Sequence, residues 1–203
     1  NNKWPNYGPE MARIIGIGEW SVSRGLFNEQ PLGNTARLAQ RKIAERGGTY
    51  HQHMHSPAEI DAHLGVWEDL STEFNIAEMR WTPGHLSGIT PELIDRSIEM
   101  GLGLGLHGQP YHSSAASGGP PWRTAINSGA VAVGAGSDGA RINTLNPWCI
   151  IYYMVTGKNV SGELTNADET ISRYNAVRLY SSVEQGWFTK EDDTLGGIDI
   201  GRF

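Results

Sequence analysis

Three histidines alternate along one short segment of this 203-residue chain: His51, His53 and His55. In a β-strand, successive side chains point to opposite faces, so a spacing of two places all three imidazoles on one face. Imidazole nitrogen is a common ligand of zinc and similar transition metals. Two interpretations stay open at this point: a metal site, or a polar surface on which the histidines only form hydrogen bonds.

Three further histidines follow segments that have the composition of strands: His85, His107 and His112. His63 is the exception, because it lies within a predicted helix, where a packing or surface role is expected. In parallel α/β barrels the carboxyl ends of the strands, with the loops after them, form the active-site face. We therefore expect six of the seven histidines to gather on one rim.

A carboxylate follows the last predicted strand. Residues 131–136 are small and apolar, and Asp138 comes directly after them. A carboxylate in this place can bind a metal ion and accept a proton from the water that the metal activates. The alternative is that Asp138 only caps the following loop, as aspartates often do.

Short apolar runs alternate with amphipathic helical stretches along the chain. The predicted strands are residues 13–18, 49–55, 76–81, 102–107 and 130–136. The predicted helices are residues 34–46, 60–70, 93–100, 122–127, 146–154 and 168–184. This alternation indicates βαβ units, a parallel sheet and an α/β fold. Two architectures fit: an open doubly wound sheet, or part of a (β/α) barrel, whose full form needs about 250 residues.

Helix-capping residues mark the starts of two predicted helices, residues 60–70 and 93–100. Ser56-Pro57-Ala58-Glu59 has the pattern of a capping box with proline in the first helical turn, and Thr90-Pro91-Glu92 resembles it. We do not expect a dinucleotide-binding fold, because no Gly-x-Gly-x-x-Gly opens a helix after the first strand. The glycines of residues 101–105 precede or lie within a strand, where they allow close packing or a tight barrel interior.

Composition limits the partners that this chain can bind. The net charge of -6 argues against non-specific binding to nucleic acid or to an anionic membrane, both of which need a basic face. No apolar run approaches the roughly 20 residues that span a bilayer. The single cysteine, Cys149, excludes an internal disulfide and is expected to be a buried packing residue. We predict a cytoplasmic protein with a small-molecule substrate.

Several of these segments together resemble the amidohydrolase superfamily, in particular the branch called amidohydrolase family 3. Gly136-Ser137-Asp138 followed by Asn146-Pro147-Trp148 is similar to the family's Gly-Ser-Asp and downstream proline segment. The other similar stretches are His51-Gln52-His53 with Ile60-Asp61-Ala62, Gln109-Pro110-Tyr111-His112, and residues 170–179 with 197–202. The resemblance covers most of the chain.

The resemblance implies a fold and a division of the chain. Residues 1–190 would form the C-terminal part of a TIM-like (β/α) barrel, roughly strands four to eight with their helices. Residues 191–203 would begin a return segment toward a small β-sandwich. The family's first-strand His-x-His would then lie upstream of Asn1.

The resemblance also implies roles for individual residues. His53 would be the fifth-strand metal ligand, and Asp138 the eighth-strand ligand and general base. His85 is the nearest candidate for the sixth-strand ligand, although it lies about two residues beyond the place that the family leads us to expect. His51, His55 and Glu19 are additional candidates; Glu19 follows the first strand, where family members carry a lysine or another ligand. Zinc, or another divalent metal, is the implied cofactor.

These observations lead to one main functional hypothesis and two alternatives. The main hypothesis is a metal-dependent hydrolase of amide-like C–N or related C–O bonds, with Asp138 moving the proton and His85 or His112 polarising the carbonyl. The first alternative is an incomplete, inactive barrel fragment, whose unpaired strand edges lead to a homo-oligomer that completes the barrel. The second is a sugar-binding α/β module that uses its tryptophans for stacking.

Overall fold

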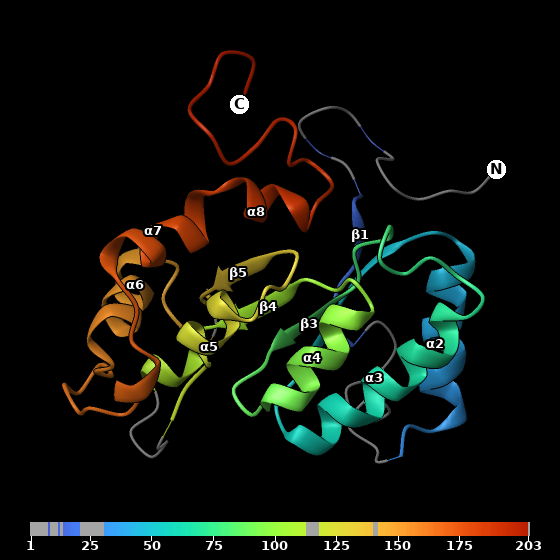
Figure 1. Ribbon diagram of the computed structural model, residues 1–203, viewed down its shortest axis with the longest axis horizontal. Helices are drawn as coiled ribbons and strands as arrows, with labels where there is room; N and C mark the ends of the chain where they lie inside the picture. Colours follow the sequence, from blue (N-terminus) through green and yellow to red (C-terminus); the bar gives the residue numbers. More distant parts are fainter. Residues whose placement is uncertain are drawn as a thin grey trace.

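A computed structural model describes residues 8, 12, 14–20, 31–112, 118–139 and 142–202 of the chain. Its five strands form one parallel sheet in the order β1-β2-β3-β4-β5 (Figure 1). The strands are β1 (Gly16–Ile17), β2 (Thr49–Met54), β3 (Thr82–His85), β4 (Leu104–His107) and β5 (Val133–Gly136). The predicted α/β class is therefore confirmed. Strand order follows chain order without reversal, as in one arc of a (β/α) barrel, whereas a doubly wound sheet reverses its order.

Helices follow the strands and cover the sheet. They are α2 (Asn34–Glu45), α3 (Pro57–Ser71), α4 (Pro91–Glu99), α5 (Trp122–Asn127), α6 (Pro147–Thr156), α7 (Arg173–Ser181) and α8 (Val183–Trp187). Two 3-10 turns, η1 (Gln109–His112) and η2 (Ala167–Glu169), complete the elements. Helices α2, α3 and α4 lie side by side, while α7 and α8 pack against β5 (Figure 1). Within the described ranges, no helix combines the length and the apolarity that a bilayer crossing requires.

The two helix starts that carry a capping pattern in the sequence are confirmed. Ser56 accepts a hydrogen bond from the backbone N–H of Glu59, and the Glu59 carboxylate accepts one in return from the backbone N–H of Ser56. Thr90 caps α4 in a similar way through the N–H of Leu93. Each cap satisfies helix donors that have no partner within the helix.

Aromatic side chains join the sheet to its covering helices. Tyr50 of β2, Trp67 of α3 and Trp81 are fully buried, and the Trp81 ring lies 5.2 Å from that of Tyr50 and 5.3 Å from that of Trp67. The indole N–H of Trp67 donates to Gln40 of α2 at 2.5 Å, and that of Trp81 donates to the Gly48 carbonyl at 2.9 Å. Each large ring thus buries its apolar surface and satisfies its polar atom.

The third strand is not where the sequence predicts it. Residues 76–80 form turns, and the strand is Thr82–His85. The prediction of a strand at residues 76–81 was wrong because Ile76 and Trp81 are buried by the helices, which gives a turn the apolar pattern of a strand. Asn75 holds the turn by accepting a hydrogen bond from the backbone N–H of Glu78 at 3.1 Å. Pro83 and Gly84, both rare within strands, concealed the true strand.

The last predicted helix, residues 168–184, is in fact three elements. Ser172 caps α7 by accepting a hydrogen bond from the backbone N–H of Asn175 at 3.2 Å, and Ser182 has an extended backbone that separates α7 from α8. Arg80 then ties the following segment to the sheet, because its guanidinium donates to the Trp187 carbonyl and to the Asp192 carboxylate. Helix propensity along residues 168–184 does not reveal that the helix is interrupted at Ser172 and Ser182.

We expect Ser56→Ala to lower the free energy of unfolding by about 1 kcal/mol, because the backbone N–H of Glu59 would lose its acceptor. Urea denaturation followed by circular dichroism measures this. Ser71→Ala, at the other end of α3, is the control and should change stability by less than about 0.5 kcal/mol. Equal effects of the two substitutions would show that the cap does not stabilise α3.

Candidate metal site

Side chains from four neighbouring strands converge at the carboxyl end of the sheet. His85 and His107 are the last residues of β3 and β4, and His53 lies one residue before the end of β2. Glu19 follows β1 in a turn. Parallel pairing in register sets His53 opposite Gly84 and His107 opposite Gly136, so the strand ends are level. The predicted rim of histidines is formed by this alignment.

The imidazole rings of five residues lie in contact and form what we call the histidine cluster: His51, His53, His55, His85 and His107. The ring of His85 is central, with its centroid 3.8 Å from that of His53, 4.9 Å from that of His55 and 4.1 Å from that of His107. His51 contacts the cluster through His107, at 5.5 Å.

Glu19 places a carboxylate against this cluster. Its Oε1 lies 2.9 Å from His85 Nε2, and its Oε2 lies 3.5 Å from His53 Nδ1. Burial by itself would raise the pKa of Glu19. The hydrogen bonds and charges of His53 and His85 outweigh burial and hold the pKa of this carboxyl well below its usual value. Glu19 is therefore anionic at neutral pH.

Burial has the opposite consequence for the outer members of the cluster. Desolvation, reinforced by the neighbouring histidines, lowers the pKa of His51 to about 4 and that of His55 to about 4. The pKa of His107 is lowered well below its usual value for the same reasons. These three imidazoles are neutral at pH 7, which is the form that binds metal ions.

Glycines in the facing strands make room for the imidazoles. A Cβ at Gly84 would lie 2.0 Å from His51 Nε2, and one at Gly105 would lie 3.1 Å from His51 Cε1. A Cβ at Gly136 would lie 3.0 Å from the ring of His107. A methyl group at Gly84 would overlap the His51 ring, whereas at Gly105 and Gly136 the rings would have to shift by a few tenths of an ångström, so the cluster depends most on the glycine in β3.

The same face of the sheet carries aromatic rings nearer the strand starts. A Cβ at Gly103 would lie 2.4 Å from the Trp187 ring, and one at Gly134 would lie 2.5 Å from the Phe188 ring. Gly103 and Gly105 are two residues apart and therefore face the same side. Trp187 and Phe188 accordingly cover the sheet beneath the histidine cluster. The expected packing role of the glycines in residues 101–105 is confirmed at these two positions.

The backbone is strained where the site lies. His85 and Leu86 have φ angles of 72° and 58°, and Trp20 and Asp138 have 47° and 54°. A left-handed conformation is unfavourable for residues with a Cβ, with a cost of about 1–3 kcal/mol each, although aspartate tolerates it better. Such strain concentrates at functional sites. At His85 it coincides with the turn that directs the imidazole between β2 and β4.

The chemistry of the cluster fits a metal ion. Within the cluster, His51 Nε2, His85 Nδ1 and His107 Nδ1 are buried and have no hydrogen-bond partner, and buried His53 Nδ1 has the long 3.5 Å contact with Glu19. Buried polar atoms are nearly always paired, so this set requires an explanation, and a bound cation supplies one. Two overlapping groups have one ligand atom from each residue within 4.8 Å of one another: His53, His55 and His85, and Glu19, His85 and His107.

The structure brings together most of the residues that the sequence singles out, but not all. His53, His85, His51, His55 and Glu19 all belong to the cluster or contact it. Because β3 is Thr82–His85, His85 ends a strand and its apparent displacement disappears.

Three further residues differ in their position relative to the histidine cluster: Asp138, His112 and His107. Asp138 lies half-buried just after β5, in neither ligand group, and His112 is exposed on η1. His107 was missed as a ligand candidate, although its place as the last residue of a predicted strand was a usable signal.

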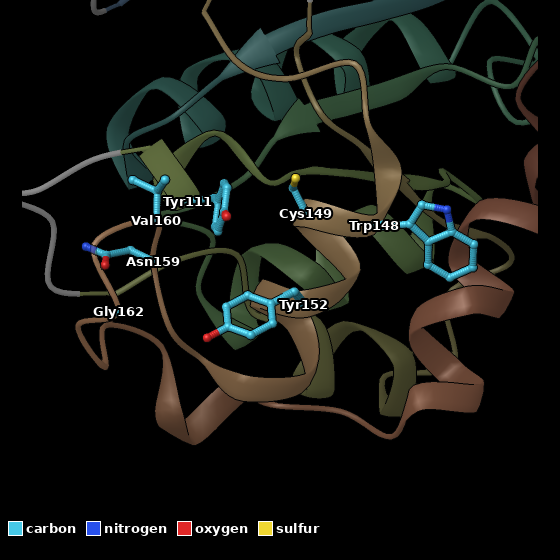
Figure 2. Close-up of a pocket in the computed structure, with 7 residues that line it drawn as sticks. All are labelled: Tyr111, Trp148, Cys149, Tyr152, Asn159, Val160 and Gly162. Atoms are coloured by element: carbon cyan, nitrogen blue, oxygen red, sulfur yellow. The ribbon is translucent and has the colours of Figure 1, made fainter.

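A separate hollow of about 370 Å³ lies on the surface beside α6. Figure 2 shows the side chains that line it: Tyr111, Trp148, Cys149, Tyr152, Asn159, Val160 and Gly162. Cys149 is half-buried here, where a buried packing residue was expected. Trp148 is 64% exposed, whereas Trp67, Trp81 and Trp122 are fully buried. Three of the tryptophans therefore have a core role, which weakens the sugar-binding alternative.

Comparison with known families identifies the fold. A model of the amidohydrolase family matches residues 24–203. The chain belongs to the amidohydrolase family. This confirms the resemblance seen in the Gly-Ser-Asp and Gln-Pro-x-His segments. Among the curated proteins, none matches the chain.

Two solved structures share the fold of this amidohydrolase. An uncharacterized metal-dependent hydrolase from Pyrococcus furiosus superposes with a TM-score of 0.69 and 18% identity, over 98% of this chain and 45% of that one. A second, from Pyrococcus horikoshii OT3, has a TM-score of 0.64 and 17% identity, over 82% of this chain and 35% of that one. The chain thus spans less than half the length of either structure.

We expect Gly84→Ala to destabilise the protein by about 1–3 kcal/mol, because the added methyl group would displace the buried His51 ring. Thermal or urea unfolding measures the change. Gly65→Ala is the matched control: Gly65 lies within α3 with nothing within 4 Å of its added Cβ, so helix propensity should stabilise it by about 0.5–1 kcal/mol. A neutral Gly84→Ala would contradict the requirement for space.

Proposed function

We propose that this chain carries the rim of a metal-dependent hydrolase that acts on amide-like C–N or related C–O bonds of a small-molecule substrate. The observation that carries the proposal is the set of buried imidazole nitrogens that lack a close hydrogen-bond partner in the histidine cluster. Membership of the amidohydrolase family supports it, and so do two structural neighbours that are described as metal-dependent hydrolases. In (β/α) barrels this end of the sheet is the catalytic face.

His53 and His85 are the residues that we propose to hold a divalent cation, with zinc as the leading candidate. Their ring centroids lie 3.8 Å apart, and the Glu19 carboxylate contacts both rings. A cation with vacant coordination positions makes water nucleophilic at neutral pH and polarises a carbonyl group. The low pKa of Glu19 supports its role as a permanent negative charge that attracts and offsets the cation.

Asp138 is the proposed general base and, as the family resemblance implies, a further ligand. It follows β5, the strand next to β4, and its left-handed backbone turns the chain at the rim. A carboxylate there can take a proton from the attacking water and transfer it to the leaving group. His112, exposed on η1 after β4, is the histidine proposed to polarise the carbonyl oxygen.

A second candidate function is suggested by the sheet edges. Among the residues that the structure describes, β1 pairs only with β2 and β5 pairs only with β4, so each has one edge without a described strand partner. Two copies of the chain could pair these edges and complete a barrel-like dimer without catalysis. Size measurement in solution separates this from the main proposal: an inactive dimer favours the fragment, and a zinc-loaded active species favours the hydrolase.

The proposed role of Asp138 leads to a direct test. We expect Asp138→Asn to lower turnover of p-nitroanilide or p-nitrophenyl ester substrates by at least about 100-fold, because the amide cannot accept the proton. Folding, measured by circular dichroism, should change little. Asp168→Asn, an exposed aspartate in η2, is the matched control and should keep full activity. Retention of most activity in Asp138→Asn would exclude the proposed role.

Metal removal provides an independent test. Dialysis against a zinc chelator should abolish hydrolysis, and added Zn²⁺ should restore it, because the neutral imidazoles of the cluster offer no substitute for the cation. Activity assays before and after dialysis, together with elemental analysis, measure this. Hydrolysis that persists after the metal content has fallen to zero would contradict metal dependence.

A further inference from the structure

We propose that Glu19, His85 and His107 form a divalent-cation site in which His107 is a metal ligand. The inference rests on the proposed metal dependence, but it names a ligand to which the family resemblance gives no role. Each residue comes from a different strand end: Glu19 after β1, His85 at the end of β3 and His107 at the end of β4. The chain itself supplies all three ligands.

The distances allow the three residues to bind one ion. One ligand atom from each lies within 4.8 Å of the other two. Glu19 Oε1 is 2.9 Å from His85 Nε2, and the centroids of the His85 and His107 rings are 4.1 Å apart. Two ligands of the same zinc ion lie at most about 4 Å apart, since each Zn–N bond is about 2.0–2.1 Å. Small side-chain rotations are enough to bring ligand atoms that lie up to 4.8 Å apart to within about 4 Å.

The donor set is also chemically suitable. Two imidazoles and one carboxylate make up the protein ligands of several catalytic zinc sites, which keep a further position for water or substrate. The carboxylate of Glu19 offsets one of the two charges of the ion. Its other oxygen lies 3.5 Å from Nδ1 of His53, the histidine proposed above to hold the ion together with His85, so the three residues extend that site rather than replace it.

The Nδ1 atom of the half-buried His107 is the independent observation that points to a ligand. This nitrogen is buried and has no hydrogen-bond partner, although buried polar atoms are normally paired. Packing alone does not account for a histidine here, because an apolar residue would fill the same space without an unpaired nitrogen. Gly136 on β5 leaves room for the ring, since a Cβ there would lie 3.0 Å from it. The strands thus accommodate an imidazole at this position.

The rival group is His53, His55 and His85, which also meets the distance condition. His85 belongs to both groups, so its substitution cannot distinguish them. His107 and Glu19 belong only to the proposed group, and His55 belongs only to the rival. These residues are therefore the informative positions. His112 is the matched control, because it is an exposed histidine on η1 outside both groups.

The experiment measures zinc affinity by competition with a chromogenic chelator, for the wild-type chain and for His107→Ala, Glu19→Gln, His55→Ala and His112→Ala. We expect His107→Ala and Glu19→Gln each to weaken Zn²⁺ binding by more than about 100-fold, beyond the 10- to 100-fold typical of losing an outer contact. His112→Ala should bind as the wild type does. Substitution of Co²⁺ gives a second readout, since His107→Ala should change the visible absorption of the bound cobalt.

Circular dichroism establishes whether each variant is folded. If His107→Ala does not fold, Glu19→Gln still tests the proposal, because Glu19 lies in a turn outside the strands. Wild-type affinity in Glu19→Gln, or in a folded His107→Ala, overturns the proposal. Loss of affinity in His55→Ala alone assigns the ion to the rival group. The proposal is also overturned if the wild-type chain binds no Zn²⁺. Zinc binding through His107 without hydrolysis would instead leave this site standing and refute only the proposed activity.

Discussion

The histidine cluster can exist only because the strands facing it have no side chains in its way. A methyl group at Gly84 would overlap the His51 ring, and methyl groups at Gly105 and Gly136 would crowd the rings of His51 and His107. Five imidazoles thereby fit on a surface that in other parallel sheets is filled by branched apolar residues. Every later property of the site depends on this close approach of rings and backbone. The shared burial, the lowered pKa values and the unpaired nitrogens all arise from it.

Close packing of titratable groups has an electrostatic consequence. Burial disfavours the charged form of His51, His55 and His107, whereas the carboxylate of Glu19 favours a positive charge beside it. A cluster with several neutral histidines and one anionic carboxylate has unused ligand atoms and a net attraction for cations. The left-handed backbone at His85 adds strain to this arrangement. Stability is thus reduced at the carboxyl ends of the strands, while the helices and the aromatic core hold the sheet behind them.

The core explains how a sheet of short strands keeps the strand ends level. Tyr50, Trp67 and Trp81 bind β2 to α3 and to the start of β3, and Arg80 ties the segment after α8 to the same region. Trp187 and Phe188 then cover β4 and β5 beneath the cluster. The amidohydrolase family match and the two structural neighbours agree with this architecture. The chain spans under half the length of either neighbour, so the candidate ligands are those that this chain itself supplies.

The sequence by itself determined the parallel α/β class and most element positions, and it singled out His53 and His85 as candidates, because periodicity, caps and strand-end placement are local properties. The capping box at Ser56 is such a case. Only the tertiary structure decided where β3 lies, because burial by helices gives a turn the same apolar pattern as a strand. It also decided that ligand atoms of Glu19, His85 and His107 lie within 4.8 Å of one another, since this depends on the register of strands far apart in sequence.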